Sequence, residues 1–368
     1  MIGQKRTGSR EGGVEVVVTE LATRMVALGH EVICYDRSGT DVNGNLAPEN
    51  PYEYNGVRVV PVRTVNIKGL AAFSSAYFAT HMAIKHRPDV IHYHAEGPCN
   101  ALPLARKAGI RTVSTIHGLD WKRAKWNGVA SYVIKRGEKA AVRASDEIIV
   151  LSKATQSYFT EEYDRETIYI PNGVEIKQAD ADSVIYDKWG LEQGSYILYL
   201  GRLVPEKRVD LLLEAFQSID TDKKLVIAGG SSDSSDYVDL IKSKAAKDSR
   251  VLLTGFVDSE DASGLYANAY CYVLPSDVEG MPMSLLEAMA NGCCCLTSDI
   301  AECKDVIGQT GFSFRAGNAY DLAQRMKELI ENPEQLKIMG EQAKDRVRRL
   351  HDWDDIVTKT LNLYSEGA

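Results

Sequence analysis

The chain has 368 residues, of which 44% are hydrophobic and 26% are charged, with a formal net charge of -8 at pH 7. A chain longer than about 300 residues predicts two domains, because a single hydrophobic core rarely grows so large. The composition excludes a disordered or fibrous protein. We expect no nucleic-acid partner.

The sequence shows no membrane or export segment and no cysteine framework. No stretch approaches about 18 consecutive apolar residues, and the opening Met1 to Arg6 lacks the apolar region of a secretory signal. We therefore expect a cytoplasmic protein. Seven cysteines without C-x-x-C spacing indicate neither disulfides nor a zinc site, and we interpret the run Cys293 to Cys295 as packing residues. We expect no metal and no resident cofactor.

Short runs rich in β-branched residues alternate with amphipathic helical stretches along the chain. This alternation predicts parallel strands joined by helical crossovers, and it occurs twice. The predicted strands are 31–35, 57–61, 90–94, 112–116 and 147–151, then 196–200, 225–228, 251–253, 271–274 and 294–297. The fold class is α/β, with two doubly wound Rossmann-like domains.

We place the N-terminal domain at residues 1–174 and the C-terminal domain at 184–350, joined by a polar linker at 175–183. Residues 351–368 form a last helical segment that could cross back to the N-terminal domain. Only Met1 and Ile2 precede the first loop, whereas a central strand needs about five residues. Either that strand is very short or the start site lies further upstream.

Gly12 and Gly13 precede a predicted helix at 14–28. Paired glycines let a phosphate approach the backbone, and the N-terminus of a helix supplies N–H groups and a favourable dipole. The same residues are typical of an ordinary strand-to-helix turn. This motif alone leaves both interpretations open.

A basic loop follows the predicted strand 196–200, with Gly201, Arg202 and Lys207 before the next helix. Arginine offers a planar fork for phosphate oxygens and lysine a mobile point charge, so the two could neutralise a departing diphosphate without magnesium. On charge alone, a solvated basic loop is the favoured alternative.

Two glutamates, Glu279 and Glu287, lie seven residues apart in an E-x7-E segment. Pro282 suits the first turn of a helix, and Asn291-Gly292 suits its end. Glu279 is therefore expected in a loop and Glu287 about one and a half turns into the helix. Both carboxylates could then point into one cleft and accept hydrogen bonds from sugar or ribose hydroxyls.

The ordered set Gly12-Gly13, His117, Gly201-Arg202, Lys207, Glu279 and Glu287 resembles the retaining glycosyltransferase family 4. The resemblance implies the GT-B fold, with two domains facing a central cleft, and metal-independent transfer from a nucleotide-diphosphate sugar to a saccharide or lipid-diphosphate-linked acceptor. Segments 3–15 and 117–121 further resemble bacterial enzymes that assemble capsular or cell-wall polysaccharide, some of them rhamnosyltransferases.

The same resemblance implies roles for individual residues. Arg202 and Lys207 would hold the diphosphate, and the N–H of Gly13 would add a contact from the opposite domain. Glu279 would bind the donor sugar, Glu287 would bind the ribose, and His117 would lie over the sugar. Catalysis is assigned to His117, Glu279, Arg202 and Lys207. The remaining donor-site residues would be Gly229, Gly255 and Phe256 around the base, and Gly280, Met281 and Pro282 at the start of the helix.

A basic and aromatic segment follows His117. It contains Trp121, Lys122, Arg123, Lys125 and Trp126, then Lys135, Lys139 and Arg143 at the spacing of one helix face. Such a face could meet an acceptor or an anionic membrane surface, which would make the protein peripheral on the inner face of the plasma membrane. A solvated helix face is the alternative.

Other functions share this architecture. Sugar phosphorylases and nucleotide-sugar epimerases remain open as alternatives, as does a catalytically inactive subunit. A nicotinamide-dependent dehydrogenase is disfavoured, because no G-x-G-x-x-G follows a predicted strand.

Overall fold

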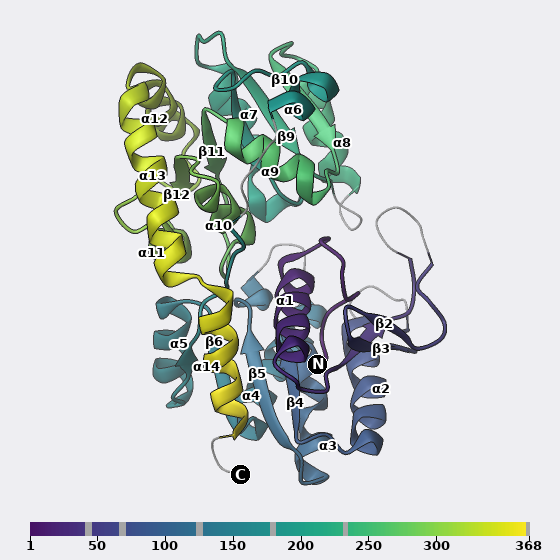
Figure 1. The fold of residues 1–368 in the computed structure, drawn as a ribbon. Helices are drawn as coiled ribbons and strands as arrows, with labels where there is room; N and C mark the ends of the chain where they lie inside the picture. Colours follow the sequence, from purple (N-terminus) through teal and green to yellow (C-terminus); the bar gives the residue numbers. More distant parts are fainter. Residues whose placement is uncertain (41–45, 66–70, 123–127, 177–181, 231–234, 366–368) are drawn as a thin grey trace. The chain divides into compact units, whose positions relative to one another are not determined.

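The computed structural model describes residues 1–40, 46–65, 71–122, 128–176, 182–230 and 235–365. They form two compact units, unit 1 (Met1–Gly173 with Trp353–Ala368) and unit 2 (Val174–Asp352) (Figure 1). Each unit contains its own mainly parallel sheet with helices packed against it. The predicted α/β class with two doubly wound domains is confirmed.

The sheet of unit 1 has the strand order β2-β3-β1 and β4-β5-β6-β7, and its pairs are parallel except β2 with β3. Its strands are β1 (Ile33–Arg37), β2 (Tyr52–Tyr54), β3 (Val57–Val62), β4 (Val90–His94), β5 (Arg111–Ile116), β6 (Glu147–Val150) and β7 (Ile168–Tyr169). Its helices are α1 (Gly13–Ala27), α2 (Ala71–His86), α3 (Leu102–Lys107), α4 (Gly128–Ala144), α5 (Lys153–Tyr163) and α14 (Trp353–Ser365), with 3₁₀ turns η1 (Pro98–Ala101) and η2 (Asp120–Lys122).

A single residue, Ile2, joins the two groups of strands in unit 1. It makes a parallel bridge to Tyr35 of β1 and another to Tyr93 of β4. Its N–H donates to the carbonyl of His92 at 2.9 Å, and its carbonyl accepts from the N–H of His94 at 2.8 Å. Ile2 is therefore buried between β1 and β4 and occupies the position of the expected first strand.

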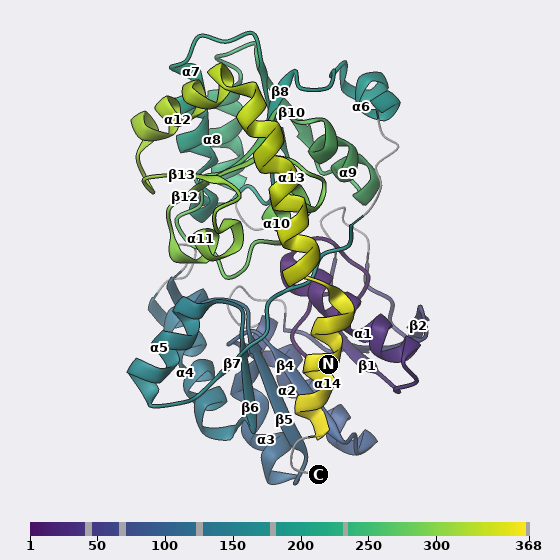
Figure 2. The same cartoon turned by 60° about the vertical axis from the view of Figure 1, so that its left-hand side comes forward.

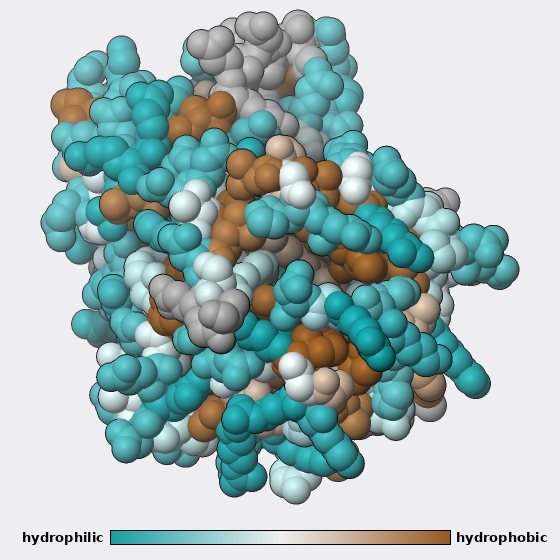
Figure 3. All heavy atoms as spheres, turned by 60° about the horizontal axis from the view of Figure 1, so that its bottom comes forward, coloured by the Kyte–Doolittle hydropathy of each residue, from teal (hydrophilic) through white to brown (hydrophobic). Residues whose placement is uncertain are grey.

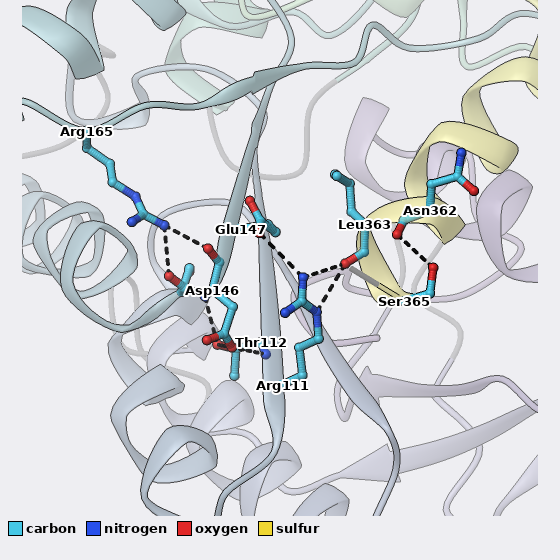
Figure 4. Close-up of polar contacts among 9 residues, drawn as sticks. Arg111, Thr112, Asp146, Glu147, Arg165, Asn362, Leu363 and Ser365 are labelled. Atoms are coloured by element: carbon cyan, nitrogen blue, oxygen red, sulfur yellow. Dashed lines mark hydrogen bonds and ion pairs between the residues drawn. The ribbon is translucent and has the colours of Figure 1, made fainter. Parts of the chain in front are cut away.

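The last helix, α14, packs against α1 and β5 of unit 1 (Figure 2). The guanidinium group of Arg111 on β5 donates to the carbonyl of Leu363 at 3.1 and 2.8 Å, and it pairs with Glu147 at 3.4 Å (Figure 4). A backbone carbonyl near the end of a helix needs such a donor, because it has no partner within the helix. The segment therefore docks through specific polar contacts as well as apolar packing.

Unit 2 has one six-stranded parallel sheet in the order β10-β9-β8-β11-β12-β13. Its strands are β8 (Tyr196–Leu200), β9 (Lys224–Ala228), β10 (Val251–Gly255), β11 (Cys271–Leu274), β12 (Cys295–Ser298) and β13 (Phe312–Phe314). Its helices are α6 (Asp182–Trp189), α7 (Val209–Gln217), α8 (Ser235–Ala245), α9 (Ser259–Asn268), α10 (Met283–Ala290), α11 (Ala301–Ile307), α12 (Ala319–Glu331) and α13 (Pro333–Leu350), with the 3₁₀ turn η3 (Pro205–Lys207).

The central strands of unit 2 read as continuous apolar runs because helices cover both faces of a parallel sheet. All four residues of β11 are buried, as are the first four of β8. The seven cysteines are all buried and unpaired, in agreement with their interpretation as packing residues. Burial raises the pKa of each thiol in the run Cys293 to Cys295, so these thiols are poor nucleophiles.

Most predicted strands agree with the observed ones to within two residues. The predicted linker is less accurate, because α6 already begins at Asp182, while residues 177–181 lie outside the described ranges.

Within the described ranges, no helix is both long and apolar enough to cross a membrane. One face of the molecule shows hydrophobic areas, in brown, among hydrophilic ones (Figure 3). Apolar atoms contribute much of any folded surface, so these areas alone indicate no binding site.

Candidate active site

In unit 2 the predicted donor residues gather where the strand order reverses. The chain proceeds from β8 to β9 and β10 on one side, then returns to place β11 on the other side of β8. Loops that leave the carboxyl ends of two such strands diverge, and this opening is where ligands bind in doubly wound sheets. The loop 201–208 follows β8 and the loop 275–282 follows β11, so both basic and acidic motifs lie at this point.

Three polar contacts connect these two loops. The backbone N–H of Asp277 donates to the carbonyl of Glu206 at 2.9 Å, and Arg208 pairs with Asp277 at 3.0 Å. Lys207 Nζ lies 2.5 Å from Glu279 Oε1, and the two side chains are only 13% and 7% exposed. The structure therefore brings together two residues that the sequence motifs place in separate roles.

Arg202 lies half-buried in the same loop as Lys207. Its backbone carbonyl accepts a hydrogen bond from the hydroxyl of buried Tyr199 at 2.8 Å. That hydrogen bond fixes the backbone of Arg202 at the carboxyl end of β8. Within the described residues, no hydrogen bond or ion pair engages its guanidinium group. The fork of donors on Arg202 is thus available to an anionic ligand.

Three glycines lie side by side at the ends of β8, β9 and β10. Gly229 has φ of +130°, and a Cβ there would lie 2.0 Å from the carbonyl oxygen of Gly201. The N–H of Gly229 donates to the carbonyl of Gly255 at 2.7 Å. Phe256 follows, with 47% of its surface exposed, and its ring lies next to Gly230. An aromatic ring beside exposed backbone suits the stacking of a flat ligand.

The second glutamate, Glu287, lies on α10 as predicted. The hydroxyl of buried Tyr266 donates to its Oε2 at 3.4 Å. The helix ends at Ala290, and Gly292 follows its C-cap with a φ of +74°, which favours glycine. A Cβ on Gly340 of α13 would lie 2.1 Å from the carbonyl oxygen of Gly292. These close contacts fix the position of the helix that carries Glu287.

The start of α10 differs slightly from the prediction. Pro282 is the N-cap, with φ of -72° and ψ of 112°, and the first helical residue is Met283. Gly280 and Met281 are buried in the loop before it. Glu279 is 8% exposed in the same loop, so the expected division between a loop carboxylate and a helix carboxylate holds.

In unit 1, His117 directly follows β5 and is 8% exposed. Its Nε2 lies 3.1 Å from Nδ1 of His94, the last residue of β4. Gly12 is the N-cap of α1 with extended backbone, and Gly13 is its first residue. The carboxylate of buried Glu15 accepts from the N–H of Lys5 at 2.9 Å, which ties the first loop to this helix.

The basic and aromatic segment differs from its prediction at Lys135. This side chain pairs with buried Glu138 at 3.1 Å, and its Nζ lies 4.1 Å from the ring centre of Trp121. The interpretation of Lys135 as part of an outer basic face is therefore wrong, because a buried carboxylate draws it inward. Lys139 and Arg143 are exposed.

Glu138 connects the turn η2 with α4 and α5. It accepts from Trp121 Nε1 at 2.9 Å and Tyr158 at 3.0 Å, and also from Tyr163. Lys122 is exposed, with Nζ 5.5 Å from the Trp121 ring centre. The three other predicted residues of this segment, Arg123, Lys125 and Trp126, lie outside the described residues.

Sequence reasoning missed Glu96, a fully buried carboxyl group between β4 and η1. Its Oε2 accepts from the N–H of Asp120 at 2.9 Å. Burial, then the charges of Asp120 and Glu138, raise the pKa of Glu96 well above its ordinary value. Burial alone would raise the pKa of Glu138, but the neighbouring Glu96, Tyr163 and Lys135 side chains hold this pKa below its ordinary value. The pKa values of the two carboxyl groups therefore shift in opposite directions, and burial of Oε1 without a hydrogen-bond partner among the described residues favours the neutral form at Glu96.

The described ranges contain no group of three or more His, Cys, Asp or Glu side chains arranged to hold a metal ion. The cationic side chains in the loop 201–208 of unit 2 are Arg202, Lys207 and Arg208, of which Lys207 pairs with Glu279 and Arg208 with Asp277.

Two family models match the chain, one in each half of the sequence. The family model described as Glycosyltransferase Family 4 matches residues 11–178, and the model described as Glycosyl transferases group 1 matches residues 185–346. The glycogen synthase of Mycobacterium tuberculosis is 27% identical, with 96% of this chain and 91% of that protein covered.

Solved structures agree on the fold. Sucrose-phosphate synthase from Thermosynechococcus elongatus aligns with a TM-score of 0.82 and 21% identity, covering 96% of this chain and 93% of that chain. Anabaena HepE, solved in complex with UDP and glucose, aligns with a TM-score of 0.80 and 17% identity, covering 98% of each chain. The fold is that of the GT-B glycosyltransferases. The chain is a glycosyltransferase of the family 4 type.

Proposed function

We propose that this protein is a retaining, metal-independent glycosyltransferase that moves a sugar from a nucleotide-diphosphate donor to a saccharide or lipid-linked acceptor in the assembly of a surface polysaccharide. The observation that carries the proposal is the cluster of Arg202, Lys207 and Glu279 at the switch point of the unit 2 sheet. It combines two cations with a carboxylate where a nucleotide-sugar would present phosphates and hydroxyls.

The donor would lie across the ends of β8 to β11. The guanidinium of Arg202 would hold the diphosphate, Phe256 would stack on the base, and Glu287 would accept hydrogen bonds from the ribose. Glu279 would bind the sugar hydroxyls with its second carboxylate oxygen while Oε1 remains paired with Lys207. The presence of UDP in the structure of Anabaena HepE supports a nucleotide donor of this kind.

Transfer with retention would place the acceptor hydroxyl on the same face of the sugar as the leaving diphosphate, whose oxygen accepts the acceptor's proton. Positive charge from Arg202 and Lys207 would stabilise the diphosphate as negative charge develops on it. Positioning and electrostatics would then supply most of the rate enhancement. Full transfer activity after EDTA treatment supports this part, whereas an absolute requirement for added magnesium contradicts it.

The acceptor side of the proposal concerns the outer face of α4. Val129 and Tyr132 are 76% and 71% exposed, and Arg136, Lys139 and Arg143 follow on the same exposed face. Exposed apolar groups beside basic ones suit an anionic lipid surface or a lipid-diphosphate acceptor. Flotation with liposomes that contain anionic lipid, but not with neutral ones, is the expected result, and Arg136→Glu with Lys139→Glu should abolish it.

A donor screen tests the central proposal. Thermal unfolding is followed with UDP-, GDP- and dTDP-sugars, including a dTDP-rhamnose arm, because a ligand that binds only the folded state raises Tm by mass action. One donor class should raise Tm in the wild type and have a much smaller effect in Arg202→Ala. Arg325→Ala, which removes an exposed arginine from the same unit, is the matched control.

Product analysis separates the alternatives. A glycosyltransferase releases nucleotide only when an acceptor is present, and NMR of the product should show the donor's anomeric configuration. Nucleotide-sugar isomerisation without acceptor would indicate an epimerase, and phosphate-dependent cleavage of a saccharide would indicate a phosphorylase. Donor binding without turnover against any acceptor would favour an inactive subunit.

A further inference from the structure

Three histidine rings form a row at the ends of β4 and β5 in unit 1. His92 and His94 lie two residues apart on β4, so they point to the same side of the sheet, with ring centres 4.1 Å apart. The ring centres of His94 and His117 are 5.3 Å apart. His92 and His94 belong to no motif named in the sequence analysis, and His94 lies next to the proposed catalytic residue His117.

The ring of His92 is held at both nitrogens. Its Nδ1 lies 2.7 Å from the hydroxyl of Tyr364 on α14, and its Nε2 lies 2.7 Å from the hydroxyl of Thr115 on β5. The ring of His94 packs on it and is completely buried. His94 therefore has a defined orientation, with Nδ1 directed at His117.

Complete burial favours the neutral form of the His94 ring. Burial, followed by the nearby His92 and His117, lowers the pKa of His94 well below its ordinary value. A neutral imidazole has a proton on one nitrogen and a lone pair on the other. The short contact between His94 Nδ1 and His117 Nε2 must contain one proton, contributed by one of the two rings.

The other nitrogen of His94 decides between the two arrangements. His94 Nε2 is buried and has no hydrogen-bond partner among the described residues. If His117 donated, the proton of His94 would sit on this nitrogen as a buried N–H without an acceptor. If His94 donates, only a lone pair is left without a partner. Buried N–H groups without acceptors are the rarer and less favourable state.

We propose that His94 is a positioning residue that donates its Nδ1–H to Nε2 of His117 and thereby holds His117 in the tautomer protonated on Nδ1. In this state Nδ1 of His117 carries the proton and the lone pair of Nε2 is occupied by His94, so His117 has no basic nitrogen left to act as a proton acceptor. In this tautomer His117 cannot remove a proton from the acceptor. The consequence for transfer rests on the function proposed above, whereas the tautomer itself does not.

The tautomer is measured in full-length protein labelled with ¹⁵N-histidine. Long-range ¹H–¹⁵N correlation spectra distinguish a protonated from an unprotonated ring nitrogen, and His117→Gln and His94→Leu assign the two ring systems. The expected spectrum shows His117 protonated on Nδ1 and unprotonated on Nε2. A proton on His117 Nε2 in the wild type would overturn the proposal, whatever the activity of the protein.

Variants of His94 supply the second test. His94→Asn places an amide N–H near the position of Nδ1 and should keep the His117 tautomer, whereas His94→Leu removes the donor and should release it. Transfer should fall about 10-fold or more in kcat for His94→Leu, with KM nearly unchanged, and should recover largely in His94→Asn. His30→Gln, at an exposed histidine, is the matched control.

The two readouts separate the two hypotheses. The expected tautomer together with no transfer to any acceptor contradicts only the proposed function. A His117 tautomer that is unchanged in a folded His94→Leu variant contradicts the positioning role. Circular dichroism and Tm identify a variant that does not fold, in which case the wild-type and His94→Asn spectra still decide the question.

Discussion

Lys207 Nζ lies 2.5 Å from Glu279 Oε1, and this ion pair connects the loops that follow β8 and β11. Both side chains are largely shielded from solvent. Removal of one partner from such a pair leaves a desolvated charge, which costs far more than the pair itself contributes. Variants at Glu279 must therefore be chosen so that a loss of binding is not confused with a loss of folding.

Glu279→Gln should keep the fold and lose transfer. The amide oxygen can still accept from Lys207, but a neutral amide binds sugar hydroxyls less well than a carboxylate, so we expect kcat/KM to fall at least about 100-fold. Glu279→Ala should also lower the free energy of unfolding by about 3 kcal/mol.

Urea unfolding and transfer assays on both variants check this prediction. Glu328→Ala provides the control, because its pair with Arg325 is exposed and should contribute less than about 1 kcal/mol. Wild-type turnover in a folded Glu279→Gln variant would contradict the assignment of Glu279 to the donor site.

Two glycines of α4 should respond in opposite directions to the same substitution. A Cβ on Gly137 would lie 2.0 Å from the carbonyl oxygen of Glu96, whereas a Cβ on Gly128 would meet nothing within 4 Å. We expect Gly137→Ala to destabilise the protein by about 2 kcal/mol and Gly128→Ala to be neutral or slightly stabilising.

Chemical denaturation measures both effects, and tryptophan fluorescence adds a local readout, because Gly137→Ala should displace Glu138 from Trp121. Equal stability of the two variants would show that α4 can move away from Glu96 at little cost.

The stability of the protein should decline with rising pH through Glu96. Its pKa is raised in the folded state, so above the ordinary value of 4.5 the folded protein binds more protons than the unfolded chain. The contribution of this group is fully present below pH 4.5 and is lost as the pH rises through the folded-state pKa. Its slope cannot exceed about 1.4 kcal/mol per pH unit.

Glu96→Gln mimics the protonated group and retains an acceptor for the N–H of Asp120. We therefore expect a flatter decline of Tm with pH in this variant than in the wild type, measured from pH 5 to pH 9. Glu334→Gln, an exposed glutamate in the first turn of α13, serves as the control. Parallel curves for Glu96→Gln and the wild type would mean that Glu96 does not titrate in this range.

The docking of the last helix should depend on Arg111. Its guanidinium binds the carbonyl of Leu363 twice and also pairs with Glu147. Arg111→Ala should lower the free energy of unfolding by about 2 kcal/mol, because charged hydrogen bonds to a partly buried carbonyl are lost. Hydrogen exchange of α14 amides should accelerate in this variant but not in Arg348→Ala, whose side chain is 60% exposed. Unchanged exchange would show that apolar packing alone holds α14.

The strand and helix pattern could be predicted from sequence because it depends on local periodicity. Apolar runs such as 196–200 and 271–274 fall in the predicted strands, and the helix predicted at 14–28 is observed at Gly13–Ala27. The error at Lys135 has a physical cause as well. Spacing identifies a helix face, but which face turns inward depends on Glu138, Trp121 and Tyr158, which come from three elements.

By itself, the sequence determined the α/β class, the two-domain repeat and the motifs with glycines, basic residues and two glutamates, because these features depend on residues close together in the chain. Only the tertiary structure decided which of them meet. Lys207 and Glu279 are 72 positions apart, and His94 at the end of β4 is 23 positions from His117, which follows β5. Such contacts arise from strand order and register, which bring the carboxyl ends of neighbouring strands to one edge, and a linear pattern does not specify them.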